Sequence, residues 1–166
     1  AAGMFGKLSS GNSLLCQKTL FHLADCYLKL DQKHDARMAF SSASKLDHDK
    51  GIQEDALFNY AVVTYELSYT PFNEAIQALN RYIEKYPLSK RTDEAYNYLV
   101  MAYTTTKNYK MALSSLEKIQ DKTPEIKKAY QRIAYYRALE LINNLKYHEA
   151  IGLLNKSTTY GIIDNR

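Results

Sequence analysis

Apolar residues along the chain recur at spacings of three and four, which is the period of an α-helix, and not at every second position as in a strand. Each apolar run is followed by a short polar turn and then by a second apolar run of the same kind. Two runs joined in this way predict an antiparallel helical hairpin. Four hairpins can be placed along the sequence, at approximately residues 14–48, 52–87, 91–124 and 126–158.

Two sets of small residues repeat with the period of the hairpins. In the first helices they are Ala24, Ala61, Val100 and Ala138, at steps of 37, 39 and 38 residues. In the second helices they are Ala36, Ala75, Ala112 and Ala150, at steps of 39, 37 and 38 residues. A small residue on each helix lets the two backbones approach closely, and the next hairpin can cover the apolar face that each hairpin leaves open. The predicted fold class is therefore all-α, an α-α superhelix (solenoid) of about four antiparallel helical hairpins.

Several positions recur together and match a known repeat. In the first hairpin they are Leu20, Leu23, Ala24, Tyr27, Ala36, Phe40 and Ala43, and in the third they are Tyr96, Leu99, Tyr103, Ala112, Leu116, Ile119 and Pro124. With this spacing the chain resembles the tetratricopeptide-repeat (TPR) family over roughly residues 17–158. The resemblance implies a single TPR-like array over residues 1–166. The steps of 37 to 39 residues exceed the family's repeat of about 34, so the helices or turns must be extended.

Three places carry helix-start signals. Thr70 and Thr123 each precede a proline, which predicts a threonine N-cap with proline at the first helical position. Ser89 and Asp93 are candidate caps of the helix that follows Pro87.

The chain stops about where another first helix would begin, so we expect a fragment of a longer chain with further repeats of the same kind. The segment RYIEKYPLSKRTDEAYNYL resembles repeats of bacterial envelope proteins, and EDALFNYA and YELSYTPFNEA resemble large multi-repeat proteins of Bacteroidetes. These resemblances favour the periplasm or cell envelope over the cytoplasm.

Charge and hydropathy narrow the expected partners. The 22 basic and 18 acidic residues are interspersed, so no face stands out as a nucleic-acid footprint, and we expect no nucleic-acid binding. No run approaches the roughly 18 apolar residues of a membrane span, so we expect no membrane insertion by this part of the chain. The expected partner is a protein or peptide.

No pattern of chemical side chains predicts an enzyme, a cofactor or a metal site. None of the four histidines, at 22, 34, 48 and 148, has a second ligand at i+3 or i+4 of the kind that a metal site on one helix would use, and the pair nearest to such an arrangement is His22 with Cys26. That pair could bind a metal or activate a thiol, but a buried thiol beside a surface histidine is the simpler interpretation. The acidic clusters at 53–55 and 93–94 lie at expected helix starts, where negative charge interacts favourably with the positive end of the helix dipole.

The family resemblance implies that the first helices of successive hairpins line a concave, partner-binding face. The matching positions are 18, 21, 25 and 28, then 55, 58, 62 and 65, then 94, 97, 101 and 104, then 132, 135, 139 and 142. From these the candidate partner-binding groove is Phe21, Asp25, Leu28, Phe58, Val62, Tyr65, Asn97, Met101, Arg132 and Tyr135. An apolar segment, extended or helical, is the expected ligand. The alternative is that any one of these apolar residues packs against a neighbouring helix.

Three functions remain open from the sequence. The first is a non-catalytic scaffold that binds a peptide or protein segment in this groove. The second is an architectural spacer within a large multi-repeat protein of the cell envelope, in which surface substitutions would be silent. The third is an RNA-binding helical repeat, which the mixed charge disfavours.

Overall fold

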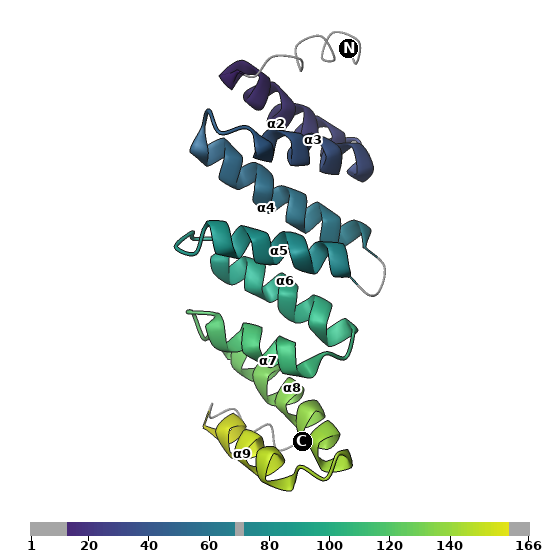
Figure 1. Cartoon of the computed structure of the whole chain (residues 1–166), viewed down its shortest axis with the longest axis vertical. Helices are drawn as coiled ribbons and strands as arrows, with labels where there is room; N and C mark the ends of the chain where they lie inside the picture. Colours follow the sequence, from purple (N-terminus) through teal and green to yellow (C-terminus); the bar gives the residue numbers. More distant parts are fainter. Residues whose placement is uncertain (1–12, 69–71, 160–166) are drawn as a thin grey trace. The chain divides into compact units, whose positions relative to one another are not determined.

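The computed structural model describes residues 13–68 and 72–159, and all regular secondary structure in these ranges is helical (Figure 1). The helices are α2 (Leu14–Lys29), α3 (Lys33–Lys45), α4 (Lys50–Leu67), α5 (Asn73–Lys85), α6 (Thr92–Thr105), α7 (Tyr109–Lys118), α8 (Pro124–Asn143) and α9 (Tyr147–Thr158). They pack in consecutive pairs, α2 with α3, α4 with α5, α6 with α7, and α8 with α9. The prediction of an all-α fold built from about four helical hairpins is confirmed.

The chain divides into two compact units, residues 1–89 and residues 90–166, here called unit 1 and unit 2. Unit 1 holds the first two hairpins and unit 2 the last two. The single array over residues 1–166, and its origin as part of a longer chain, stay predictions.

Small residues form the helix contacts in unit 1, as their period predicts. One cluster of buried side chains joins α2, α3 and α4; its members are Ala24, Ala36, Ala39, Phe40, Ala43, Ala56 and Val63. The ring of Phe21 meets the ring of Phe40 edge to face, with 5.6 Å between centroids. Because alanine leaves little side-chain volume, α3 packs closely against both α2 and α4, and the large rings fill the space beside that contact.

Three hairpins turn in the same way. The residue after the C-cap of the first helix adopts left-handed backbone angles at Asp31, Lys107 and Leu145, with φ of 58°, 56° and 59°. The next amide then donates to a helix carbonyl five residues earlier, with N···O distances of 2.8, 2.7 and 2.8 Å. This is a Schellman closure, which usually places glycine at the left-handed position. Part of the second hairpin's turn, including the predicted Thr70 cap, lies outside the described residues, and α5 begins at Asn73.

One polar position closes every hairpin and was not recognised from the sequence. It lies seven residues before the small residue of each first helix, and its occupants, called the closing residues below, are Gln17, Glu54, Asp93 and Gln131. Each forms hydrogen bonds to the end of its own hairpin or to the segment that follows it. The position therefore ties the start of a hairpin to its end.

Gln17, in unit 1, is the most buried of the four closing residues. The Gln17 side chain has no exposed surface and bonds to the backbone of Leu46 and Asp49, between α3 and α4. Glu54 accepts hydrogen bonds from the hydroxyls of Ser89, at 2.5 Å, and Tyr82, at 3.2 Å. The interpretation of residues 53–55 as a helix-start cluster is wrong, because α4 already begins at Lys50.

In unit 2 the same position forms fewer or more exposed bonds. The Asp93 carboxylate accepts from the backbone amides of Gln120 and Asp121, both at 3.0 Å, after α7. The Gln131 side-chain amide donates to the carbonyl of Ser157 in α9 at 3.3 Å. Asp93 does lie in the first turn of α6, as the dipole argument predicts.

A carboxylate joins three helices of unit 2 and should make that unit sensitive to acid. Burial raises the pKa of Glu117, but hydrogen bonds from Lys156, at 2.6 Å, and Tyr130, at 2.9 Å, outweigh burial, and the charges of Lys156 and Lys122 add to them. The net pKa lies below its ordinary value of 4.5. Since the folded state then binds this proton more weakly than the unfolded state, the stabilisation is present above pH 4.5 and is lost as the pH falls through the folded pKa.

We therefore expect Glu117→Gln to reduce the loss of stability between neutral pH and about pH 3. The expected reduction is below about 1 kcal/mol, because the carboxylate is partly exposed and water screens the ion pair. Thermal unfolding of the two proteins at both pH values measures it. Glu149→Gln is the control, since among the described residues Glu149 pairs only with the neighbouring Lys146, on the surface at the start of α9. An unchanged acid dependence in Glu117→Gln would contradict the assignment.

Candidate protein-interaction site

The three candidate groove residues on α2 lie on one side of that helix and are partly covered. Phe21 and Leu28 are half-buried and pack against the core cluster of unit 1. Asp25 is half-buried and lies 4.0 Å from the imidazole of His22. Other residues of unit 1 thus cover part of the apolar surface of α2 at these positions.

The candidate residues on α4 are covered still further. Phe58 is only 5% exposed, and its ring meets that of Tyr82 edge to face at 5.1 Å. Its assignment to an open groove is wrong, because Tyr82 of α5 and Phe58 form part of the core. Tyr65 is half-buried and stacks on Phe72 at 5.3 Å, and Val62 is also half-buried.

In unit 2 three of the four candidate positions are exposed. Asn97 is half-buried and Met101 is exposed on α6, and both Arg132 and Tyr135 are exposed on α8. Leu139 and Ile142 continue the same face of α8 at helical spacing. These four residues of α8, Arg132, Tyr135, Leu139 and Ile142, are called the α8 stripe below.

The apolar part of the α8 stripe is well exposed. Tyr135 is 55% exposed, Leu139 40% and Ile142 39%. With the neighbouring Tyr136, α8 carries more exposed large apolar side chains than any other described helix. Arg132, at the N-terminal end of the stripe, forms no ion pair within the described residues. Arg137, by contrast, is held by Glu140 at 3.0 Å.

Tyrosine rings extend the stripe toward α7. The ring of Tyr136 lies 5.8 Å from that of Tyr135 and stacks on the ring of Tyr109, at the start of α7, at 5.4 Å. Sequence reasoning missed this tyrosine cluster (Tyr109, Tyr135 and Tyr136). The only signal was the large number of tyrosines, 15 in the chain, which does not say which of them meet.

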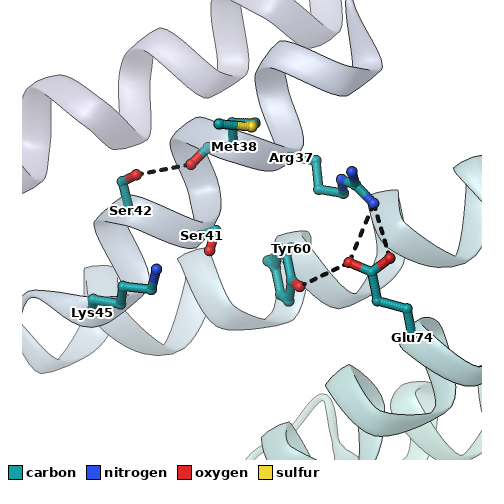
Figure 2. A pocket seen from close by; sticks show the side chains of 7 residues that line it. All are labelled: Arg37, Met38, Ser41, Ser42, Lys45, Tyr60 and Glu74. Carbon is teal, nitrogen blue, oxygen red and sulfur yellow. Dashed lines mark hydrogen bonds and ion pairs between the residues drawn. The ribbon is translucent and has the colours of Figure 1, made fainter.

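A shallow pocket of ≈ 220 Å³ lies elsewhere, on unit 1, where α3, α4 and α5 meet (Figure 2). Its lining residues are Arg37, Met38, Ser41, Ser42, Lys45, Tyr60 and Glu74. Arg37 Nη1 lies 3.2 and 3.3 Å from the two carboxylate oxygens of Glu74, and the Tyr60 hydroxyl donates to one of them at 3.4 Å (Figure 2). Because its arginine is already neutralised by a carboxylate, the pocket is best explained as a link between α3 and α5.

The described residues contain no group of three or more histidine, cysteine or acidic side chains placed to hold a metal ion. Cys16 is buried and Cys26 is exposed. The interpretation of Cys26 as a buried thiol beside a surface histidine is therefore wrong, because α2 turns both His22 and Cys26 outward. In the ranges that the structure covers, no helix is both long and apolar enough to cross a membrane.

Comparison with known proteins agrees with this architecture. The family model of the tetratricopeptide repeat matches residues 18–46 and 55–89, which cover most of the first hairpin and most of the second. A crystal structure of MamA protein is similar over 87% of this chain and 72% of that chain, with 22% sequence identity and a TM-score of 0.56. No curated protein matches the chain. The structural similarity shows the fold and confirms the α-α superhelix class. The first two hairpins thus carry tetratricopeptide repeats, and such repeats generally serve as a scaffold for protein–protein interaction.

Proposed function

We propose that this scaffold binds a segment of a partner protein along the α8 stripe. The observation that carries the proposal is the exposure of Tyr135, Leu139 and Ile142 on one face of one helix. An exposed apolar patch with a polar rim is typical of an interaction site, because association removes its surface from water. The family and its fold are typical of non-catalytic proteins, and binding without turnover is the activity that such a face supports.

The stripe also lies where the family resemblance places the partner. Positions 132, 135, 139 and 142 are the fourth-hairpin members of the face that the resemblance assigns to binding. In unit 1 the corresponding apolar positions are buried or half-buried, with Phe58 in the core and Tyr65 stacked on Phe72. We therefore place the main contact on α8, with Met101 of α6 as a further exposed candidate in the same unit.

A random peptide library selected on the whole chain tests the proposal. The affinity of each selected peptide is then measured for wild type, for Leu139→Ala and for Ile151→Ala. Loss of a central apolar contact typically costs more than about 1 kcal/mol, so we expect about tenfold weaker binding to Leu139→Ala. Ile151 is the matched control, because it is a 56% exposed aliphatic residue of the same unit that lies on α9.

Two outcomes would count against α8. Selected peptides that bind equally well to wild type and Leu139→Ala would place the site elsewhere. A library that yields no binder would favour the architectural spacer, for which surface substitutions are silent. Circular dichroism of each variant shows whether its helices are intact.

A further inference from the structure

Four polar side chains at or beside the α8 stripe form no hydrogen bonds within the part of the chain that the structure describes. The hydroxyls of Tyr109, Tyr135 and Tyr136 and the guanidinium of Arg132 form none with any other described residue. A guanidinium can only donate, and a phenol hydroxyl donates readily. The stripe and the tyrosine cluster together therefore offer apolar surface edged by unused hydrogen-bond donors.

From this chemistry we infer that the partner segment is proline-rich and binds as a polyproline II helix. The inference rests on the proposed function and names the kind of segment that the α8 stripe takes. A proline-rich segment has carbonyl acceptors that are not used internally and few backbone N–H groups. Its pyrrolidine rings are apolar and pack on aromatic rings, as in other domains that bind such segments. The hydroxyl and guanidinium donors can thus bond to the carbonyls of the segment, while its pyrrolidine rings pack on the tyrosine rings.

The dimensions agree with this occupant. Tyr135 and Ile142 are seven positions apart on α8, which is about 10 Å along a helix that rises 1.5 Å per residue. Prolines three positions apart in a polyproline II helix are about 9 Å apart. A segment lying along α8 can therefore place one proline on the ring of Tyr135 and the next on Ile142, with Leu139 between them.

An amphipathic helical partner is the competing occupant, and the donors argue against it. The backbone carbonyls of an α-helix are satisfied internally except in its last turn. Such a partner would cover Leu139 and Ile142 but could offer acceptors to the donors around the tyrosine cluster only from its side chains. Desolvating unpaired donors costs free energy, so the free hydroxyls favour a segment with open carbonyls.

Two labelled probe peptides of equal length separate these occupants. One has proline at every third position, and the other is an amphipathic helix with the same number of apolar residues. Fluorescence anisotropy measures their binding to the whole chain. We expect the proline-rich peptide to bind with a dissociation constant below about 1 mM and more tightly than the helical peptide.

Tyrosine-to-phenylalanine substitutions test the hydroxyls, because they keep each ring and remove only the donor. We expect Tyr135→Phe with Tyr136→Phe to weaken binding of the proline-rich peptide about tenfold, since one hydrogen bond contributes about a factor of two to ten. Tyr147→Phe is the matched control, because Tyr147 is a 52% exposed tyrosine of the same unit on α9. It should leave binding unchanged.

The possible failures are distinguishable. Tighter binding of the helical peptide, weakened by Leu139→Ala, would overturn the proline-rich assignment and keep α8 as the binding face. Equal effects of the Tyr135→Phe, Tyr136→Phe pair and of Tyr147→Phe would overturn the role of the hydroxyls. Binding of neither peptide below about 1 mM would overturn the inference, while the library selection still decides the proposed function.

Discussion

Replacing Tyr82 with alanine is expected to lower the free energy of unfolding of unit 1 by about 4 kcal/mol, because truncating a fully buried aromatic ring leaves a cavity. Tyr82 has no exposed surface, and its ring packs edge to face on Phe58 at 5.1 Å. Its hydroxyl lies 3.2 Å from the Glu54 carboxylate and 2.8 Å from the Ser89 hydroxyl. The alanine variant loses both the ring packing and these hydrogen bonds.

Tyr82→Phe separates the two losses. It keeps the ring and removes only the hydroxyl, and Ser89 still donates to Glu54, so we expect a cost of about 1 to 2 kcal/mol. Urea denaturation followed by circular dichroism gives the free energies, and hydrogen exchange assigns the loss to unit 1. Tyr60→Phe is the control and should cost less than about 0.5 kcal/mol, because its hydroxyl makes one long bond, at 3.4 Å, on the surface. If Tyr82→Ala cost no more than Tyr82→Phe, the packing account would be wrong.

The helical hairpins could be predicted because their signal is local. A period of three to four residues and a small residue at a constant step are both visible in a single sequence. The alanines that carried this argument, such as Ala24, Ala61 and Ala112, have no exposed surface in the structure. The Thr123 cap is also confirmed, since its hydroxyl accepts from the Ile126 amide and α8 begins at Pro124.

The predicted caps at the start of α6 are wrong for a tertiary reason. The helix begins at Thr92, and Arg91 is its N-cap without a side-chain bond. Ser89 donates instead to Glu54, and Asp93 accepts from backbone amides beyond α7. Both residue types are common caps, but a sequence does not show that distant parts of the chain already use their side chains.

The candidate groove was predictable only in part for a related reason. Helical spacing identifies which residues share a face of a helix, and on α8 that face is exposed at Arg132 and Tyr135. Spacing does not show what covers a face. On α4, Phe58 has the same place in the repeat as Tyr135, yet its ring packs on Tyr82. The contact of Tyr109 with Tyr136 likewise joins two helices, so the spacing of residues along one helix does not predict it.

Gln17→Ala is expected to destabilise unit 1 by about 3 kcal/mol, because it removes the hydrogen-bond partners of three partly buried backbone groups. The Gln17 amide nitrogen donates to the carbonyls of Leu46, at 2.8 Å, and Asp49, at 3.1 Å, and its oxygen accepts from the Asp49 amide at 2.8 Å. Urea denaturation measures the loss. Gln131→Ala, at the equivalent position of the last hairpin, is the control. Its side chain is half-buried and makes one bond of 3.3 Å, so we expect a loss below about 1 kcal/mol.

Gln17→Glu tests whether the stability of unit 1 depends on hydrogen-bond donation by the Gln17 side chain. The side chain keeps its size and one acceptor oxygen, but as a carboxylate it would face two carbonyl oxygens with no proton to donate. We expect it to destabilise unit 1 at least as much as alanine does at neutral pH. A glutamate variant as stable as wild type would show that Gln17 fills space and does not bind the turn.

Replacing Gln17 should also destabilise the start of α4, because Asp49 bonds both to Gln17 of α2 and to the first turn of α4. Its backbone bonds to Gln17, while its carboxylate accepts from the Ile52 amide at 3.1 Å and caps the start of α4. In Gln17→Ala we therefore expect faster hydrogen exchange at the first amides of α4, beyond the exchange that global unfolding alone would produce. Faster exchange confined to α2, with α4 unchanged, would mean that Gln17 supports its own helix and does not position the next hairpin.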